Sequence, residues 1–406
     1  MDKKYLKLKA ACYSSNVSMS VVGNISPLLF LTFRELYDIS YSLLGLLVLI
    51  NFSTQLIVDL IFSFFSHKFN IKKTVRLMPI LGFFGLIIYG LSPLIFNDNV
   101  YAGLCIGTVI FSASSGLGEV LISPVIASIP AENPEREMSK LHSIYAWGVV
   151  GVVLFATAFL FFIGKESWQI LVFILSLIPL CSAFLFTLTD IPKMETPEKT
   201  SGALEFVKNK SVWLCVFAIF LGGASECIMA QWASGYLEKA LGIPKVWGDI
   251  FGVALFAAAL GLGRSLYGKY GKNIKRVLAL GSLGAFICYF LAAVSPFAPL
   301  GLLACAFTGF FVSMLWPGNL VVAADRFPQG GVMIFALMAA GGDLGASVGP
   351  QLVGVITDFA MESEKLISLS STLGILPEQL GMKLGMLIGM LFPLVSFILH
   401  FRKKHS

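Results

Sequence analysis

Four acidic side chains lie inside long apolar stretches of this chain: Asp59, Glu119, Glu226 and Asp343. A carboxylate in the hydrocarbon core of a bilayer costs about 2.5–3.5 kcal/mol on insertion scales, so it persists where it faces a polar cavity, a partner charge or a moving proton. We therefore expect these four residues to be proton-coupling acids. Arg264, also within an apolar stretch, requires a partner, and both Glu226 and Asp343 remain candidates.

Glu119 is the favoured protonation site, and Glu226 is the second choice. Ser112, Ser115, Glu119 and Ser123 are spaced at intervals of three or four residues and form one polar stripe on a helix. A polar stripe exposed to lipid would be costly, so we expect it to face a cavity. The alternative role for Glu119 is a structural hydrogen bond to a neighbouring helix.

A second polar stripe consists of Asn51, Gln55 and Asp59, spaced four residues apart. Amide and carboxylate groups each form hydrogen bonds with hydroxyl groups, which suits a sugar-like ligand. The alternative for Asp59, near the cytoplasmic end of its segment, is an ion pair with Lys or Arg. Asp343 has a similar alternative, because an ion pair with Arg264 would explain it equally well.

Aromatic residues in the second half suggest a platform for a solute. Trp232 and Tyr236 are one helical turn apart, so their rings share a face. The alternative is an aromatic belt at the membrane surface. The expected substrate-binding residues are Asn16, Ser20, Asn24, Asn51, Gln55, Ser115, Ser123, Trp232, Tyr236, Trp316 and Asn319.

The composition is that of a polytopic membrane protein. Hydrophobic residues make up 57% and charged residues 13% of the 406 residues, whereas soluble domains carry about 25% charge. A membrane helix needs about 20 apolar residues. Candidate spans occur near 8–31, 40–66, 74–95, 99–129, 139–163, 168–188, 211–238, 247–268, 276–294, 297–324, 331–358 and 383–401.

Basic residues predict the orientation of these spans. With a cytoplasmic N-terminus, 22 of the 29 Lys and Arg residues fall on the cytoplasmic side and 6 on the outer side. This bias follows the positive-inside rule and places both termini in the cytoplasm. The net charge of +6 therefore reflects topology and not nucleic-acid binding.

The sequence indicates neither an enzyme nor a bound cofactor. The seven cysteines lie in apolar segments without metal-ligand spacing, so we expect buried single thiols and no metal. Motifs for nucleotide-driven transport, zinc hydrolysis or a serine nucleophile do not occur in a plausible context.

Two halves of six spans are expected, with a bundle at 1–188, a cytoplasmic linker at 189–210 and a second bundle at 211–406. The halves also share a motif, since Asn-Ile-Lys followed by a basic residue begins at Asn70 and again at Asn273. Parallel repeats with a binding site at their interface are a recurrent transporter design. The expected fold is all-α, with twelve transmembrane helices in two pseudo-symmetric bundles.

These features resemble the major facilitator superfamily, whose signature after the second helix is G-x-x-x-D-R-x-G-R-[RK]. The second half keeps Gly268, Gly271, Lys275 and Arg276, and the resemblance implies a structural or gating role for Gly268 and Gly271. The first copy is degraded and has Ser63, Ser66, His67 and Asn70 at the corresponding positions. Further structural or gating candidates are Arg264, His142 near a helix end and Pro317 beside Trp316.

Within that superfamily, three segments resemble the branch of fucose and glucose/galactose permeases or related permeases. One of them, residues 339–351, contains G-G-D-L-G around Asp343 followed by a proline, as in the eleventh helix of related permeases. Residues 116–124 read G-L-G-E-V-L-I-S-P and place Glu119 at the branch's helix-four acid, with Ser123 in place of its Asn. Residues 222–237 place Glu226, Trp232 and Tyr236 at similar spacing. The resemblance implies sugar and proton handling, although the branch's first-helix carboxylate has no counterpart here.

We therefore expect a proton-coupled symporter for a small polar solute, most readily a sugar, working by alternating access. Its expected partners are the solute, protons and the lipid bilayer, and it is expected to act as a monomer in the cell membrane, a bacterial plasma membrane. The alternatives are drug or metabolite efflux by proton antiport, a sugar uniporter and, least favoured, a nontransporting receptor. The fifth segment lacks the Gly-Pro pattern of drug antiporters, which argues against efflux.

Overall fold

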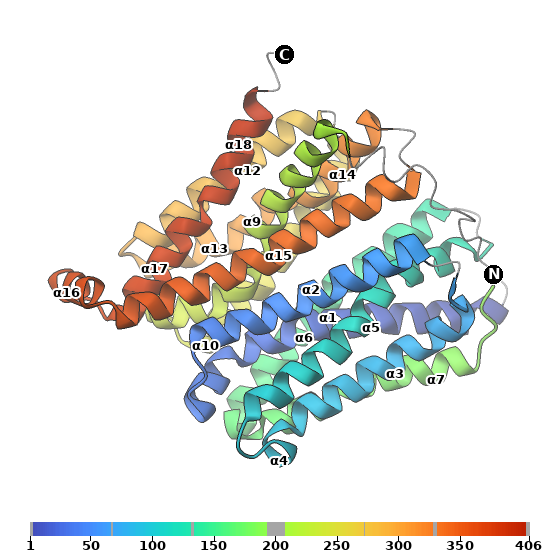
Figure 1. The fold of residues 1–406 in the computed structure, drawn as a ribbon, viewed down its shortest axis with the longest axis horizontal. Helices are drawn as coiled ribbons and strands as arrows, with labels where there is room; N and C mark the ends of the chain where they lie inside the picture. Colours follow the sequence, from blue (N-terminus) through green and yellow to red (C-terminus); the bar gives the residue numbers. More distant parts are fainter. Residues whose placement is uncertain are drawn as a thin grey trace. The chain divides into compact units, whose positions relative to one another are not determined.

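The computed structural model of the chain describes residues 3–65, 68–130, 134–192, 208–271, 273–327 and 331–402. The regular elements among them are helices (Figure 1). From the N-terminus these are α1 (Lys3–Tyr37), α2 (Tyr41–Phe65), α3 (Ile71–Gly90), α4 (Ser92–Ile95), α5 (Val100–Ala127), α6 (Pro134–Ile163) and α7 (Trp168–Thr187). Then come α9 (Lys210–Leu241), α10 (Lys245–Trp247), a π-helix at Gly248–Ala254, α11 (Leu255–Tyr270), α12 (Ile274–Val294), α13 (Ala298–Val312), α14 (Leu315–Arg326), α15 (Gly331–Glu362), α16 (Glu364–Thr372), α17 (Pro377–Gly389) and α18 (Leu391–Arg402).

The helices confirm the predicted all-α membrane fold. In the described part of the chain, 11 helices are long and apolar enough to cross a bilayer. The remaining predicted span, 74–95, corresponds to α3, which is 20 residues long and packs against α5 and α7. Several spans are built from two consecutive helices, such as α13 with α14 and α17 with α18. With these, each of the twelve apolar segments in the sequence corresponds to helix.

By packing, the chain divides into two compact units. The first contains Met1–Ser26 and Ile50–Gly202, and the second contains Pro27–Leu49 and Ala203–Ser406. The boundary in α1 falls at Pro27, which lies inside the helix. A proline has no N–H to donate to the preceding turn, so the helix is weakest at the point where its packing partners change. Of the linker expected at 189–210, residues 193–207 lie outside the described part.

In the first unit, α3 packs along α5 and α7, as the adjoining α3 and α7 ribbons in Figure 1 illustrate. The buried core includes Leu8 from α1, Val75 from α3, Leu121 from α5 and Phe186 from α7. Each helix thus contributes apolar side chains from the face that packs against its neighbours.

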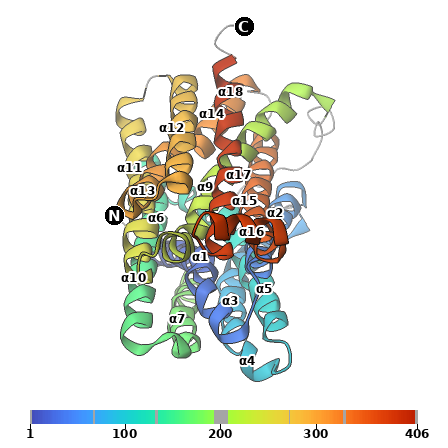
Figure 2. The ribbon, with the colours of Figure 1, turned by 90° about the vertical axis from the view of Figure 1, so that its left-hand side faces the viewer.

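In the second unit, α9 is the central helix and packs most extensively on α15. A Cβ added at Gly345 would lie 2.9 Å from the backbone nitrogen of Ala224, and one at Gly349 would lie 3.2 Å from the Cα of Ala224. Small residues therefore let α9 and α15 approach closely. Figure 2 shows α11, α12 and α13 running beside one another on another side of this unit.

The repeated Asn-Ile-Lys motif has the same structural role in both units. Asn70 is the N-cap of α3, and its side-chain oxygen accepts a hydrogen bond from the backbone nitrogen of Lys73 at 3.1 Å. Asn273 is the N-cap of α12 and accepts from the backbone nitrogen of Arg276, also at 3.1 Å. An Asn at this position satisfies a backbone N–H that has no partner inside the helix.

The cysteines differ in part from the expected burial. Five are buried, but Cys105 is half-buried and Cys181 is exposed on α7. An apolar segment of a membrane protein can turn part of its surface toward lipid, so apolar surroundings in the sequence do not guarantee burial within the protein.

Candidate solute and proton sites

Helices α2 and α5 share a hydrogen-bonded polar cluster in the first unit. The Asn51 side-chain oxygen accepts hydrogen bonds from the Ser112 hydroxyl at 2.6 Å and from the Gln55 amide nitrogen at 3.1 Å. All three residues are buried. Asp59, 5% exposed, follows Gln55 by one turn on α2. The two polar stripes expected from the sequence are therefore joined at Asn51 and Ser112.

Glu119 lies on α5, seven residues beyond Ser112 and thus on the same side of that helix. It is exposed, in contrast to the buried serines at 112 and 115. An exposed carboxylate in the middle of a membrane-spanning helix is tolerated where it contacts water and not lipid. The side chain of Ser123, the next residue of the stripe, lies outside the described part of the structure.

The polar residues of α1 bond mainly to backbone within the first unit. Asn16 donates to the carbonyl of Leu141 at 2.8 Å, and Ser20 donates to the carbonyl of Tyr145 at 2.9 Å. Asn24 donates to the carbonyl of Ser20 at 2.9 Å. The contacts of Asn16 and Ser20 tie α1 to α6, and all three contacts occupy donor groups of residues expected to bind solute.

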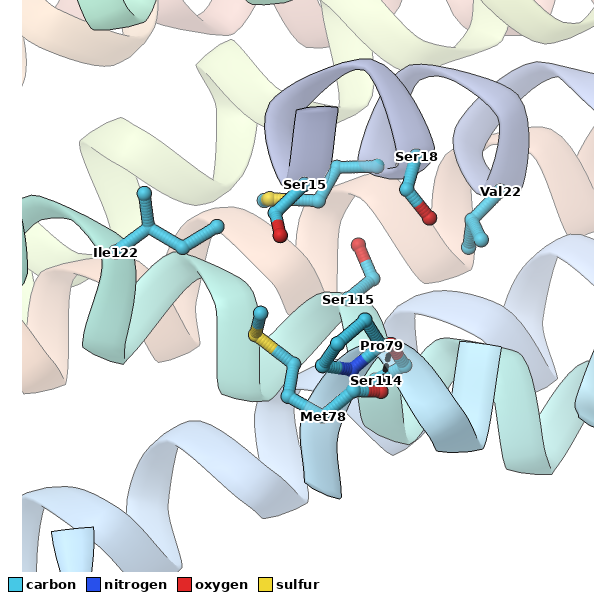
Figure 3. Close-up of a pocket in the computed structure, with 9 residues that line it drawn as sticks. Ser15, Ser18, Val22, Met78, Pro79, Ser114, Ser115 and Ile122 are labelled. Atoms are coloured by element: carbon cyan, nitrogen blue, oxygen red, sulfur yellow. Dashed lines mark hydrogen bonds between the residues drawn. The ribbon is translucent and has the colours of Figure 1, made fainter. Parts of the chain in front are cut away.

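A small pocket lies between α1, α3 and α5 (Figure 3). Serine hydroxyls come from both α1 and α5, and Pro79 lies on the α3 side. The residues that line it are Ser15, Ser18, Met19, Val22, Met78, Pro79, Ser114, Ser115 and Ile122. Of these, only Ser115 is among the substrate-binding residues expected from the sequence.

The second unit contains an ion pair between Glu226 on α9 and Arg264 on α11. A terminal guanidinium nitrogen of Arg264 lies 3.4 Å from each carboxylate oxygen of Glu226. The Nε of Arg264 also donates to the carbonyl of Ser313 at 3.1 Å. The Arg264 side chain is 40% exposed and that of Glu226 is 18% exposed. Glu226, one of the two acids considered from the sequence, therefore forms an ion pair with Arg264.

Asp343 on α15 belongs to the same polar region, since Cys227 lies within electrostatic range of Glu226, Asp343 and Arg264. The Asp343 side chain is buried. Among the described residues, this region therefore includes the two acids Glu226 and Asp343 and the guanidinium of Arg264.

Two further substrate candidates lie on α14. Asn319 is buried and donates to the carbonyl of Leu315 at 2.6 Å. Trp316 is half-buried and packs against the backbone of α15, where a Cβ added at Gly342 would lie 2.5 Å from its ring. Pro317 is in the first turn of α14, where a missing N–H is tolerated.

Trp232 and Tyr236 on α9 share one face, as their spacing predicts, but both rings are fully buried. The Trp232 indole donates to the carbonyl of Pro350 at 2.9 Å, and the Tyr236 hydroxyl donates to the carbonyl of Ala292 at 2.6 Å. Their hydrogen-bonding groups are thus used within the second unit.

A charged cluster that the sequence did not single out joins the end of α1 and the start of α2 to α15 and α17. The carboxylate of Asp358 accepts hydrogen bonds from the backbone nitrogens of Tyr41 at 3.1 Å and Ser42 at 2.6 Å. Glu378 accepts from the Tyr41 hydroxyl at 2.5 Å and pairs with Arg34 at 3.5 Å. All of these residues belong to the second unit. Charged residues near helix ends usually face solvent, so the sequence alone did not identify this cluster. The hydrogen bonds and the ion pair in the structure identify it.

The remaining gating candidates are only partly described. Gly268 lies in the last turn of α11, and Gly271 ends that helix by donating to the carbonyl of Tyr267. His142 lies within α6, and its side chain is outside the described part.

A helical chain with this many spans, and with charged residues held in pairs and networks among them, is an integral membrane protein of the transporter type. The family model of the Major Facilitator Superfamily matches residues 11–360. The chain therefore belongs to the major facilitator superfamily. A search of curated proteins gave no match.

Solved structures with the same fold include a bacterial homologue of the human lysosomal transporter Spinster, at 14% identity and a TM-score of 0.73, covering 99% of this chain and 97% of that one. The nucleoside transporter NupG is 14% identical, with a TM-score of 0.72 and complete coverage of both chains. The fucose:proton symporter FucP of E. coli is 16% identical, with a TM-score of 0.63 and complete coverage of both chains. At these identities the likeness concerns the fold.

Proposed function

We propose that this chain is a proton-coupled symporter that brings a small, hydroxyl-rich solute, most simply a sugar, into the cell by alternating access. The observation that carries the proposal is the hydrogen bond from Ser112 to Asn51. It joins the polar stripes of α2 and α5 into one surface, on a helix that presents Glu119 two turns further along.

Each part of this surface has a chemical task. The amide groups of Asn51 and Gln55 both donate and accept hydrogen bonds, which matches a ligand whose hydroxyl groups do the same. Glu119 is the proposed proton-binding acid, because an exposed carboxylate can exchange a proton with water directly. Glu226 is the second proposed acid. Its charge state depends on its neighbours, because it forms an ion pair with Arg264.

Asp59 and Asp343 stay candidates for coupling in this proposal. Other proposed solute contacts require a rearrangement of the hydrogen bonds described above, wherever those bonds are present. These contacts are proposed for Asn16, Ser20, Asn24, Ser123, Trp232, Tyr236, Trp316 and Asn319. Asn51 and Gln55 are the stronger candidates because Ser112 joins them to the polar stripe of α5 that carries Glu119. Ser115 lies on the same stripe, in the small pocket beside α1 and α3.

The related structures support a hydroxyl-rich solute. FucP is described as a fucose:proton symporter and NupG as a nucleoside transporter, and both kinds of solute contain a sugar ring. We further propose a plasma-membrane location with both termini in the cytoplasm, on the basis of the distribution of Lys and Arg, and transport by a single copy of the chain.

The test is uptake by proteoliposomes that contain the purified protein, with an imposed inward proton gradient. Labelled pentoses, hexoses, deoxyhexoses and nucleosides form the panel. We expect one class to accumulate above its external concentration, and Glu119→Gln to abolish accumulation while retaining exchange of internal for external solute. Glu166→Gln, in the short turn before α7, is the matched control and should transport normally.

Other outcomes assign a different function. Equilibration without accumulation would identify a uniporter. Gradient-driven loss of solute from loaded vesicles would identify an exporter. Binding without any flux would identify a receptor, and the absence of uptake across the whole panel would exclude the sugar proposal.

A further inference from the structure

The pocket between α1, α3 and α5 contains two buried hydroxyl groups whose hydrogen bonds are not satisfied by the protein. Ser18 and Ser115 are each 5% exposed. Within the described residues, neither hydroxyl has a hydrogen-bond partner, whereas the nearby Ser15 bonds to Ser182 at 2.5 Å and Ser114 bonds to the carbonyl of Met78 at 2.6 Å. Buried polar groups in native proteins are paired with protein or with ordered water.

Other hydroxyl residues in the same helices show that a backbone carbonyl one turn back is available as a hydrogen-bond acceptor. Ser20 on α1 donates to the carbonyl of Asn16, and Thr108 on α5 donates to the carbonyl of Leu104, each one turn back along its own helix. This backbone bond is the usual way for a helical hydroxyl to be satisfied. Ser18 and Ser115 do not make it, and Figure 3 shows both side chains directed toward the space between α1 and α5.

The size and lining of the pocket select the ligand. The free space admits about one water molecule and is too small for a sugar. The lining side chains are serines and apolar residues, without a carboxylate or a basic group to balance an ion. A water molecule fits because it both donates and accepts hydrogen bonds and needs two to four polar partners.

We propose that this pocket is a water-binding site, in which one ordered water molecule bridges the hydroxyl groups of Ser18 on α1 and Ser115 on α5. The bridge links two helices of the first unit. It also places a polar, exchangeable group one turn before Glu119 on α5.

Radiolytic labelling tests this directly, because hydroxyl radicals made from a buried water oxidise the methionine beside it. Met78 lines the pocket and is 2% exposed, whereas Met229 and Met386 are 0% exposed and lie in the second unit away from it. The intact protein in nanodiscs would be exposed to an X-ray pulse in ¹⁸O-water. The formation of methionine sulfoxide would then be measured by mass spectrometry. We expect Met78 to be oxidised several-fold faster than Met229 and Met386.

A variant that fills the pocket gives the second arm of the experiment. Ser115→Val should lower the Met78 rate to that of Met229, while Thr108→Val, outside the pocket on the same helix, should leave it unchanged. Equal rates for the three methionines in the unaltered protein would overturn the proposal, as would a fast Met78 rate that persists in Ser115→Val. Unchanged rates at Met229 and Met386 show that each variant is folded. No transport activity enters this test, so it stands apart from the proposed function.

Discussion

Arg264 on α11 bridges Glu226 on α9 and the carbonyl of Ser313 at the end of α13. Its terminal nitrogen lies 3.4 Å from both oxygens of Glu226, and its Nε lies 3.1 Å from the Ser313 carbonyl oxygen. One guanidinium thus connects three helices of the second unit, using the several donors that distinguish Arg from Lys.

Replacing Arg264 with Gln should reduce both transport and stability. The loss leaves a half-buried Glu226 without its counter-charge, while the pair itself is partly exposed, so we expect the free energy of unfolding to fall by about 1 kcal/mol. Uptake should fall about ten-fold, equivalent to about 1.4 kcal/mol in the barrier. Proteoliposome uptake and thermal unfolding in detergent measure these two effects.

The double variant Glu226→Gln/Arg264→Gln is the control for the charge. It removes both members of the pair, so no uncompensated charge remains, and we expect it to be more stable than Arg264→Gln alone. The changes in the free energy of unfolding of the two single variants, Glu226→Gln and Arg264→Gln, are compared with that of the double variant. If the two single changes sum to the double change, the interaction between Glu226 and Arg264 contributes nothing and the interpretation of the pair is wrong.

Replacing Ser112 with Ala should weaken solute binding. The substitution removes the 2.6 Å hydrogen bond that orients the Asn51 side chain. A hydrogen bond of this kind contributes about 1 kcal/mol, so the apparent KM for the solute should rise about five-fold. The maximal rate should change little, because Glu119 is retained.

Thr108→Ala provides the matched control on the same helix. Thr108 is also fully buried, but its hydroxyl donates to the Leu104 carbonyl of α5 itself. Its KM should equal that of the unaltered protein. A comparable rise in KM for both variants would attribute the effect to general loosening of α5.

Replacing Asp358 with Ala should destabilise the start of α2. Asp358 reaches from α15 to accept the backbone N–H groups of Tyr41 and Ser42, which have no partners within their helix. The loss of a capping side chain costs about 0.5–2 kcal/mol. Thermal unfolding of the protein in detergent should report this decrease.

Asp358→Asn separates hydrogen bonding from charge. The amide retains one acceptor oxygen, so this variant should lie between Asp358→Ala and the unaltered protein. Asp325→Ala, an exposed acid on α14, should have no measurable effect. An Asp358→Ala variant as stable as the unaltered protein would show that the α2 cap is not needed.

The fold could be predicted from sequence because its main determinants are local. Apolar segments of about 20 residues must become helices in lipid, where every backbone polar group has to be satisfied internally. The Asn70 and Asn273 repeat is also local, since an N-cap depends on the next few residues alone, and both positions proved to be caps.

The candidate site was predictable in its members but not in their partners. Glu119, Glu226 and Asn51 stand out as polar residues in apolar segments, and their helix faces follow from spacing. Spacing says nothing about which residue of another helix each one meets. The ion pair of Arg264 with Glu226 is a fact of how α9 and α11 pack.

The sequence by itself determined the class of protein, the helical segments and the acids that could carry a proton, because the cost of placing charge and unpaired backbone in lipid is visible in composition. Only the tertiary structure decided which polar groups are already satisfied. It buried Trp232 and Tyr236 against the carbonyls of Pro350 and Ala292, and it left Ser18 and Ser115 facing a pocket. Hydrogen bonding between residues a hundred positions apart depends on helix packing, and that packing is set by the whole chain at once.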